Sequence, residues 1–253
     1  MAERVWDRFL TEQDKAHLAM RPARRRGFGT RPALLLIDLY RWVFGDKPEP
    51  ILEAIKTWPG SCGLAAWNAI PHIQRLLAKA REVKIPIVHM TGLDGAGVEG
   101  WSEARAGGER IPQDPAARDR RRRRYDIIDE VKPLEGETVL RKASPSAFWG
   151  TPLIGHLNYL DVDTIITCGE STSGCVRASV VDGTTYRFKM VVVEECVFDR
   201  HEAAHAINLF DMNQKYADVV SLEEALAYLD AWRAAREHRE RQPGNGEAIS
   251  ASA

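Results

Sequence analysis

The chain has 253 residues, with 35 Lys and Arg against 36 Asp and Glu, a net charge of −1. This balance excludes the positive footprint of a protein that binds nucleic acid or an anionic membrane, and no apolar run approaches the length of a membrane span. Four cysteines without CxxC spacing or a secretory signal indicate a reducing cytoplasm, and a small-molecule substrate is the remaining kind of partner.

The chain divides into three parts. Residues 1–26 begin with a weak amphipathic pattern and end in the basic run ARRRGFG, which predicts a surface helix or an arm packed on a neighbouring subunit. Residues 27–241 carry evenly spaced strand and helix signals without a linker, as expected for one α/β domain. Residues 242–253, QPGNGEAISASA, have the composition of a disordered tail.

The first strand is predicted over residues 32–38, PALLLID, a continuous apolar run typical of a strand covered on both faces. It ends in Asp38, at the edge where open α/β sheets form their ligand crevice, although a helix-capping aspartate is the structural alternative. The next segment, LYRWVFGDKPEP, is aromatic-rich and broken by proline, so we predict a loop. Its Tyr40, Trp42 and Phe44 either wall a pocket or pack as ordinary core or interface aromatics.

The middle of the chain continues this alternation. Residues 67–83 have the spacing of an amphipathic helix, and residues 85–90 and 137–140 read as the second and third strands. The third strand leads into Lys142, for which an exposed strand terminus is the structural alternative. Arginines crowd residues 118–124, but acidic residues follow at once, so a solvated or salt-bridged face is a better interpretation than nucleic-acid binding.

Residues 163–187, DTIITCGESTSGCVRASVVDGTTYR, predict a strand over 164–168, a turn of small residues and a helix that opens at Cys175. Unpaired N–H groups and the helix dipole favour negative charge there, so a thiol with a usual pKa of about 8.5 can become a thiolate near neutral pH. The same N–H groups can receive an oxyanion. The alternative is a small buried cysteine, which is our interpretation of Cys168 inside the apolar strand.

Three features in this order resemble the isochorismatase-like cysteine hydrolases: a strand ending in Asp38, a strand ending in Lys142 before ASPSAFWGTPL, and a Gly-x-Ser-x-x-Gly-Cys turn into a helix. The resemblance covers about residues 27–224 and is greatest to the N-carbamoylsarcosine amidase branch, which includes maleamate amidohydrolases. It implies a Rossmann-like three-layer αβα fold with a six-stranded, mainly parallel sheet. It also implies a homo-oligomer, a tetramer or a dimer.

Residue by residue, the resemblance implies that Asp38, Lys142 and Cys175 are the catalytic triad. It places a cis peptide at Glu170–Ser171 and an oxyanion hole on the backbone N–H groups of Ser171 and Cys175. Glu170 departs from the small or apolar residue usual in the family, so the resemblance does not fix the polarity of the pocket here. Trp149, in the segment after Lys142, and Glu170 are further candidates to contact the substrate.

Arg200 follows the fifth predicted strand, residues 190–193, and matches the arginine that binds the substrate carboxylate in this branch. A guanidinium suits a carboxylate because it donates two parallel hydrogen bonds. The alternative is a scaffold role in which Arg200 pairs with Asp199 or Glu202. A sixth strand over residues 217–220 and an amphipathic helix over residues 222–241 complete the domain.

The function implied is a cysteine-dependent amidohydrolase. It cleaves the C–N bond of a small linear amide or N-carbamoyl compound bearing a carboxylate, and it releases ammonia through a thioester. No cofactor is expected and no metal, because HMTGLDGAGVEGW lacks the second histidine of the nicotinamidase metal set, which leaves His89 as a packed histidine. The alternatives are an isochorismatase-type vinyl-ether hydrolase, which does not use the cysteine, and a non-catalytic or thiol-sensing scaffold.

Overall fold

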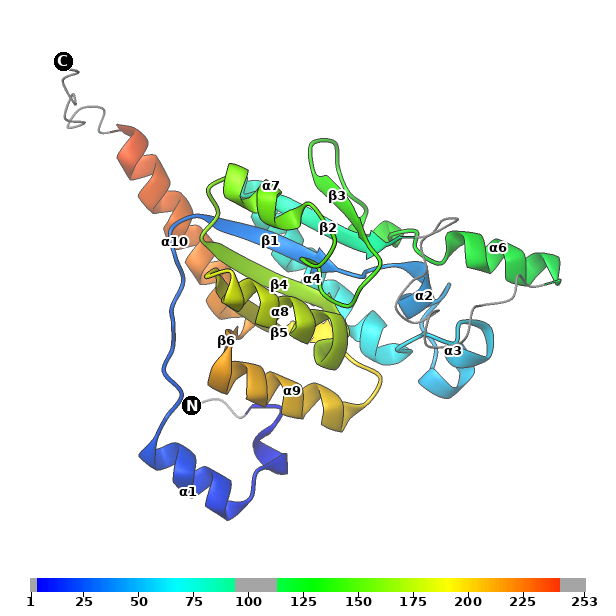
Figure 1. The fold of residues 1–253 in the computed structure, drawn as a ribbon, viewed down its shortest axis with the longest axis horizontal. Helices are drawn as coiled ribbons and strands as arrows, with labels where there is room; N and C mark the ends of the chain where they lie inside the picture. The colour runs from blue at the N-terminus through cyan, green and yellow to red at the C-terminus, as the bar shows by residue number, and fades with distance from the viewer. Residues whose placement is uncertain (1–3, 94–112, 242–253) are drawn as a thin grey trace.

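The sheet at the centre of the fold has six strands. The structure is a computed structural model that describes residues 4–93 and 113–241, and in these ranges the strand order is β3-β2-β1-β4-β5-β6. Every neighbouring pair is parallel. Helices cover both faces of the sheet, so the predicted αβα architecture is confirmed (Figure 1).

Each of the six predicted strands is present. Their bounds are β1 (Pro32–Ile37), β2 (Ile87–Gly92), β3 (Thr138–Lys142), β4 (Thr164–Glu170), β5 (Lys189–Phe198) and β6 (Asp218–Val220). The fifth strand is much longer than predicted, because it continues through Glu194 and Glu195, where its register with β4 shifts between Thr167 and Gly169. Glu194 accepts a hydrogen bond from the backbone N–H of Val5, which accounts for a carboxylate inside a strand.

The helices form two layers. Their bounds are α1 (Glu12–Met20), α2 (Arg41–Phe44), α3 (Ile51–Thr57), α4 (Leu64–Val83), α6 (Pro115–Arg123), α7 (Leu153–Tyr159), α8 (Arg177–Thr185), α9 (Glu202–Lys215) and α10 (Leu222–Arg241). Helices α4 and α10 pack on one face of the sheet, and α7, α8 and α9 pack on the other. Among the described helices, none combines the length and the apolar composition needed to cross a bilayer.

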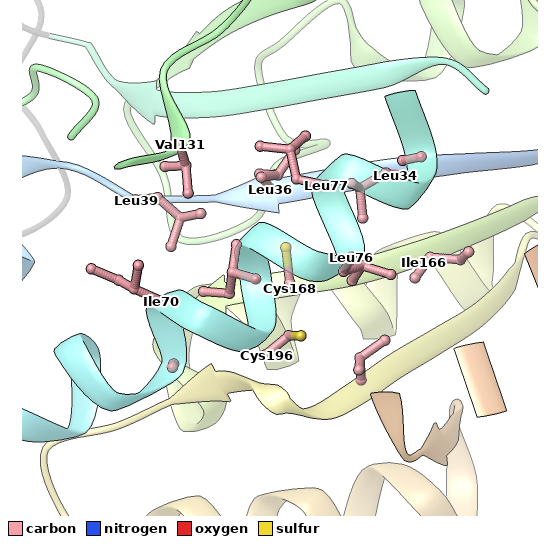
Figure 2. Packing of buried hydrophobic residues seen from close by; sticks show 14 of the residues in the cluster. Leu34, Leu36, Leu39, Ile70, Leu76, Leu77, Val131, Ile166, Cys168 and Cys196 are labelled. Atoms are coloured by element: carbon pink, nitrogen blue, oxygen red, sulfur yellow. The ribbon is translucent and has the colours of Figure 1, made fainter. Parts of the chain in front are cut away.

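The apolar stripe of α4 forms one side of the core, as its spacing predicted. Ile70, Leu76 and Leu77 lie against β1 and β4 side chains, which include Cys168 (Figure 2). Cys168 has no exposed surface, and its neighbours in the cluster are apolar. The interpretation of Cys168 as a buried structural cysteine is therefore confirmed.

The N-terminal segment packs on its own chain. Asp7–Phe9 forms only a short 3₁₀ turn, and the helix follows it as α1, which buries none of its residues. Trp6 is 5% exposed and its ring lies 6.2 Å from that of Phe210 in α9. A contact of this segment with a neighbouring subunit stays a prediction, and the predicted tail at residues 242–253 lies outside the described residues.

The predicted loop after β1 contains a helical turn, α2, so that prediction was wrong for four residues. The N–H groups of Val43 and Gly45 donate to the carbonyls of Tyr40 and Arg41, at 3.0 and 2.7 Å. Gly45 then ends the turn with a φ of 76°, a conformation that glycine adopts without steric cost. The aromatic residues of this segment are therefore held by backbone hydrogen bonds.

Candidate active site

The carboxyl ends of the parallel strands bring the predicted triad to one edge of the sheet. Asp38 directly follows β1, Lys142 ends β3, and Cys175 lies in the turn after β4. Ile37 is in register with Gly169 of β4, so the end of β1 lies beside the turn that carries the cysteine. This edge is where open α/β sheets form ligand sites.

Lys142 lies between the other two side chains. Its Nζ is 2.7 Å from Asp38 Oδ2, 3.3 Å from Cys175 Sγ and 3.1 Å from the carbonyl oxygen of Ser144. The ammonium group thus makes one ion pair, with Asp38, and two hydrogen bonds, to Cys175 and Ser144. Burial opposes the charge of Lys142, but Asp38 and Cys175 outweigh it and raise the pKa of the ammonium, which stays protonated.

Asp38 is fully buried and has an unusual backbone. Its φ is 57°, in the left-handed region that non-glycine residues seldom occupy, and its N–H donates to Met90 O at 3.0 Å. Burial raises the pKa of its carboxyl group, and Lys142 opposes that rise. Within the described residues neither carboxylate oxygen receives an aligned hydrogen bond, so both retain the capacity to accept a proton.

The surroundings of Cys175 act against the thiolate that a helix N-terminus favours. Burial raises the pKa of the thiol and the neighbouring Asp38 carboxylate raises it further, while Lys142 only partly offsets both effects. The helix geometry also differs from the prediction, because a π-helical turn, Thr172–Val176, precedes α8.

The turn that carries Cys175 is braced from two directions. The N–H groups of Gly174 and Val176 both donate to Ser171 O, at 3.0 and 3.1 Å, so neither is available to a substrate oxygen. Asp199 Oδ2 accepts from the N–H of Ser173 at 2.8 Å and from its hydroxyl at 2.7 Å. The Glu170–Ser171 peptide bond is cis.

Ser179 connects two parts of the site, and our sequence analysis missed it. Its buried hydroxyl donates to Cys175 O at 2.7 Å and accepts from the N–H of Ala147 at 2.9 Å. It thereby joins the cysteine turn to the segment that follows Lys142. The sequence feature that could have revealed Ser179 is a hydroxyl one helical turn after Cys175, on the apolar face of the predicted helix.

Arg200 has a partner that neither sequence hypothesis named. Its Nη1 lies 2.7 Å from Glu170 Oε1, and its Nη2 donates to Gly60 O. Of the N–H groups of Arg200, only the backbone N–H donates to Asp199, at 2.8 Å. Glu202 pairs with Arg8 instead. The proposed scaffold partners Asp199 and Glu202 were therefore wrong.

Glu170 is buried close to the triad. Its side chain is 7% exposed, and burial raises the pKa of its carboxyl group to about 7 although Arg200 opposes the rise. The charge of Asp38 contributes to the same rise, which places the two carboxylates within electrostatic reach of each other. Cys62, a residue that our sequence analysis did not single out, has its Sγ 3.8 Å from Glu170 Oε1.

Among the aromatic candidates, Tyr40 lies within electrostatic reach of Asp38 and Cys175. It is buried, which raises its hydroxyl pKa, and Asp38, Glu170 and Cys175 raise that pKa further. Its ring meets that of Tyr125 edge to face, with centroids 5.2 Å apart. Tyr125, directly after the arginine-rich segment, is a neighbour of Tyr40 that the sequence did not reveal.

The other aromatic candidates lie in different surroundings. Phe44 has no exposed surface and packs between the rings of Trp67 and Phe198, so it is a core residue and not a pocket wall. Trp42 is half-buried against Gly60, where an added Cβ would lie 1.9 Å from its Nε1. Trp149 is 72% exposed, and its carbonyl accepts from the Ser144 hydroxyl at 3.1 Å.

His89 is a packed histidine, as expected. Its Nε2 lies 2.9 Å from Glu137 Oε2, and burial lowers the pKa of its ring. In the two described ranges, no three His, Cys, Asp or Glu side chains are grouped so that they could hold a metal ion. Residues 94–112, which include most of the segment compared with the nicotinamidase metal set, lie outside the described residues.

The fold and these side chains define an α/β protein that carries a carboxylate, an ammonium group and a thiol together at the carboxyl edge of a parallel sheet. The family model for the Isochorismatase domain matches residues 32–224, and the chain belongs to this family. The resemblance inferred from the sequence is therefore confirmed.

Two curated relatives match most of the chain. Maleamate amidohydrolase of Pseudomonas putida is 37% identical over 213 residues, which cover 81% of this chain and 90% of the relative. N-carbamoylsarcosine amidase of Arthrobacter sp. is 31% identical over 213 residues, 82% of this chain and 75% of the relative. A solved structure of a cysteine hydrolase from Pseudomonas syringae is 18% identical over 84% of this chain and 99% of that one. Its TM-score of 0.68 supports the fold.

Proposed function

We propose that this chain is an amidohydrolase that cleaves the C–N bond of a small linear amide or N-carbamoyl compound and releases ammonia. Its two curated relatives are named as an amidohydrolase and an amidase. The observation that carries the proposal is the position of Lys142 Nζ, 2.7 Å from Asp38 Oδ2 and 3.3 Å from Cys175 Sγ. A base, a cation and a nucleophile in contact are the groups that acyl transfer requires.

In the first half of the reaction, Asp38 takes the thiol proton as Cys175 Sγ attacks the amide carbonyl carbon. Lys142 keeps its proton and stabilises the developing thiolate. The carbonyl oxygen becomes an oxyanion that accepts from the backbone N–H groups of Ser171 and Cys175. The protonated Asp38 then gives its proton to the departing nitrogen, and the C–N bond breaks to leave ammonia and a Cys175 thioester.

In the second half, water replaces ammonia. Asp38, again a carboxylate, accepts a proton from water while the water oxygen attacks the thioester carbonyl carbon. The C–S bond breaks, the thiol regains a proton, and the acid product leaves. The sum is amide plus water to acid plus ammonia, and every proton transfer passes through Asp38.

The surroundings of the reaction form part of the same proposal. All four cysteines are free and three of them are buried, which suits a reducing cytoplasm. A homo-oligomer, a tetramer or a dimer, is proposed from the family resemblance. Sedimentation equilibrium of the full chain tests it, and a monomer at micromolar concentration would contradict it.

A screen for ammonia release tests the function directly. The panel contains small linear amides, ureas and N-carbamoyl amino acids, and Cys175→Ala should lower kcat/KM by ~10³-fold or more on any substrate that is cleaved. Cys168→Ala, in the apolar core, is the matched control and should retain most of the activity. Absence of ammonia from the whole panel, or equal loss in both folded variants, would contradict the proposal. Cleavage of a vinyl ether but of no amide would favour the isochorismatase-type alternative.

A further inference from the structure

Arg200, the cation that a substrate carboxylate would need, is already paired with Glu170. Glu170 ends β4 and lies in register with Phe198 of β5, so Arg200, two residues further on, reaches it directly. Oε1 of the glutamate meets Nη1 of the guanidinium at 2.7 Å, and Nη2 donates to Gly60 O. Both terminal nitrogens of the guanidinium are thus engaged by the chain itself.

The carboxylates around the site already outnumber the cations. Asp38 lies 2.7 Å from Lys142 and Glu170 lies 2.7 Å from Arg200, and Asp199 is a third carboxylate that acts on Glu170. Glu170 is peptide-bonded to Ser171, whose N–H is a proposed oxyanion donor. Since its charge also raises the pKa of Cys175, Glu170 is within electrostatic reach of the reacting sulfur. A substrate carboxylate would add an uncompensated negative charge beside a buried one, which is strongly unfavourable.

The second oxygen of Glu170 is an available acceptor. Both Arg200 Nη1 and Cys62 Sγ contact Oε1, at 2.7 and 3.8 Å. No residue in the described part of the chain donates a hydrogen bond to Oε2. A carboxylate oxygen with remaining lone pairs, on a side chain that is otherwise largely buried, favours a ligand that donates an N–H group.

We propose that Glu170 sets the substrate class: the pocket accepts uncharged amides or ureas whose remote N–H group Glu170 binds, and it discriminates against amides with a remote carboxylate. This inference rests on the proposed amidohydrolase function. It departs from the carboxylate substrate expected from the family resemblance, because the family position that is small or apolar is a glutamate here. Specificity of this kind comes from a repulsive group as much as from an attractive one.

The test compares two isosteric substrates, the monoamide of a short dicarboxylic acid and the corresponding diamide, by initial rates of ammonia release. Wild type should cleave the diamide with a kcat/KM at least ~10-fold higher. Glu170→Gln preserves the shape of the side chain and removes its charge. It should therefore raise the ratio of kcat/KM for the monoamide over the diamide by ~10-fold or more. Glu202→Gln removes an exposed carboxylate two residues from Arg200 and should leave the ratio unchanged.

Wild type that cleaves the monoamide at least as well as the diamide, or a folded Glu170→Gln variant with an unchanged ratio, would overturn the inference. Either result leaves the amidohydrolase function intact, since ammonia is still released. Wild type that releases ammonia from neither substrate nor from any other amide would overturn both proposals.

The pH dependence of wild type gives a second measurement that needs no folded variant. The charged groups that act on Glu170 are Arg200, Asp38 and Asp199, and the pKa of its carboxyl group is raised to about 7. Below that pH Glu170 is protonated and the charge of Arg200 is uncompensated, so kcat/KM for the monoamide should rise relative to kcat/KM for the diamide. The ratio of kcat/KM for monoamide over diamide should fall as pH rises through about 7. Titration of the triad cancels from this ratio, and a flat ratio would overturn the inference.

Discussion

At the scale of single residues, the site depends on one buried cation in contact with a carboxylate and a thiol. The side chains of Lys142 and Asp38 are 5% and 0% exposed, so neither charge is solvated by water. A buried ion pair of this kind contributes little net stability over an apolar pair, but loss of one partner leaves a buried charge without compensation. Replacing Lys142 or Asp38 alone should therefore change the free energy of unfolding more than replacing both with an apolar pair.

Lys142→Met is expected to lower the free energy of unfolding by about 3–5 kcal/mol, because Asp38 stays buried without its partner. Asp38→Asn should also destabilise the protein, and asparagine tolerates the positive φ at this position. The double variant should be more stable than the sum of the two losses predicts, by about 2 kcal/mol. Urea denaturation measures all three, and strictly additive losses would show that the two charges are not coupled.

The proximity of Asp38, Lys142 and Cys175 could be predicted from the sequence because each lies at or after the end of a predicted strand, and parallel strands end at one edge. The Glu170–Arg200 pair could not, because it joins positions 30 residues apart through the register of β4 and β5. The rise in the pKa of the Cys175 thiol could not be predicted from the sequence either, because the burial of the thiol and the adjacent Asp38 carboxylate come from tertiary packing.

At the scale of secondary structure elements, α8 holds the nucleophile turn against the segment after Lys142. The hydroxyl of Ser179 makes both connecting hydrogen bonds, to Cys175 O and from the N–H of Ala147. Since Ser179 is fully buried, water cannot replace it. The N-terminal half of the helix thus ties the turn that carries Cys175 to the segment that follows Lys142.

Ser179→Ala should lower the free energy of unfolding by about 1–3 kcal/mol, because the N–H of Ala147 loses its buried acceptor. It should also lower kcat more than it raises KM, since the position of Cys175 relative to Lys142 changes. Thr185→Ala is the matched control, because its hydroxyl donates to Val181 O at 2.8 Å on the exposed side of the same helix. That variant should stay within about 0.5 kcal/mol of wild type. Equal effects of the two changes would contradict the positioning role of Ser179.

Element types were more predictable than element lengths. The apolar runs of β1 and β4 and the stripe of α4 follow from periodicity alone. The length of β5 did not, since Glu194 and Glu195 interrupt its apolar run and are accommodated by contacts with Val5 and with Leu222, whose N–H donates to Glu195 at 2.8 Å. Local sequence does not encode such distant partners.

At the scale of the whole molecule, the N-terminal segment belongs to the folded unit. Trp6 packs in the cluster on the α8 and α9 side of the sheet, and Arg4 pairs with Glu194 at 3.2 Å. Trp6→Ala should therefore cost about 2–4 kcal/mol in unfolding free energy. Phe9→Ala, at a ring that is 37% exposed, should cost less than about 1 kcal/mol. Equal stability of the two variants in thermal and urea unfolding would mean that the segment is only loosely attached.

The proposed mechanism requires a covalent bond between Cys175 and the acyl group of the substrate. Acid quenching within the first turnover on a substrate identified by ammonia release, followed by peptide mass spectrometry, detects that bond. We expect the peptide that contains Cys175 to gain the mass of the substrate less ammonia, and the same peptide of the Cys175→Ala variant to gain nothing. Release of one equivalent of ammonia in that turnover with no acyl group on Cys175 would contradict the proposed thioester intermediate.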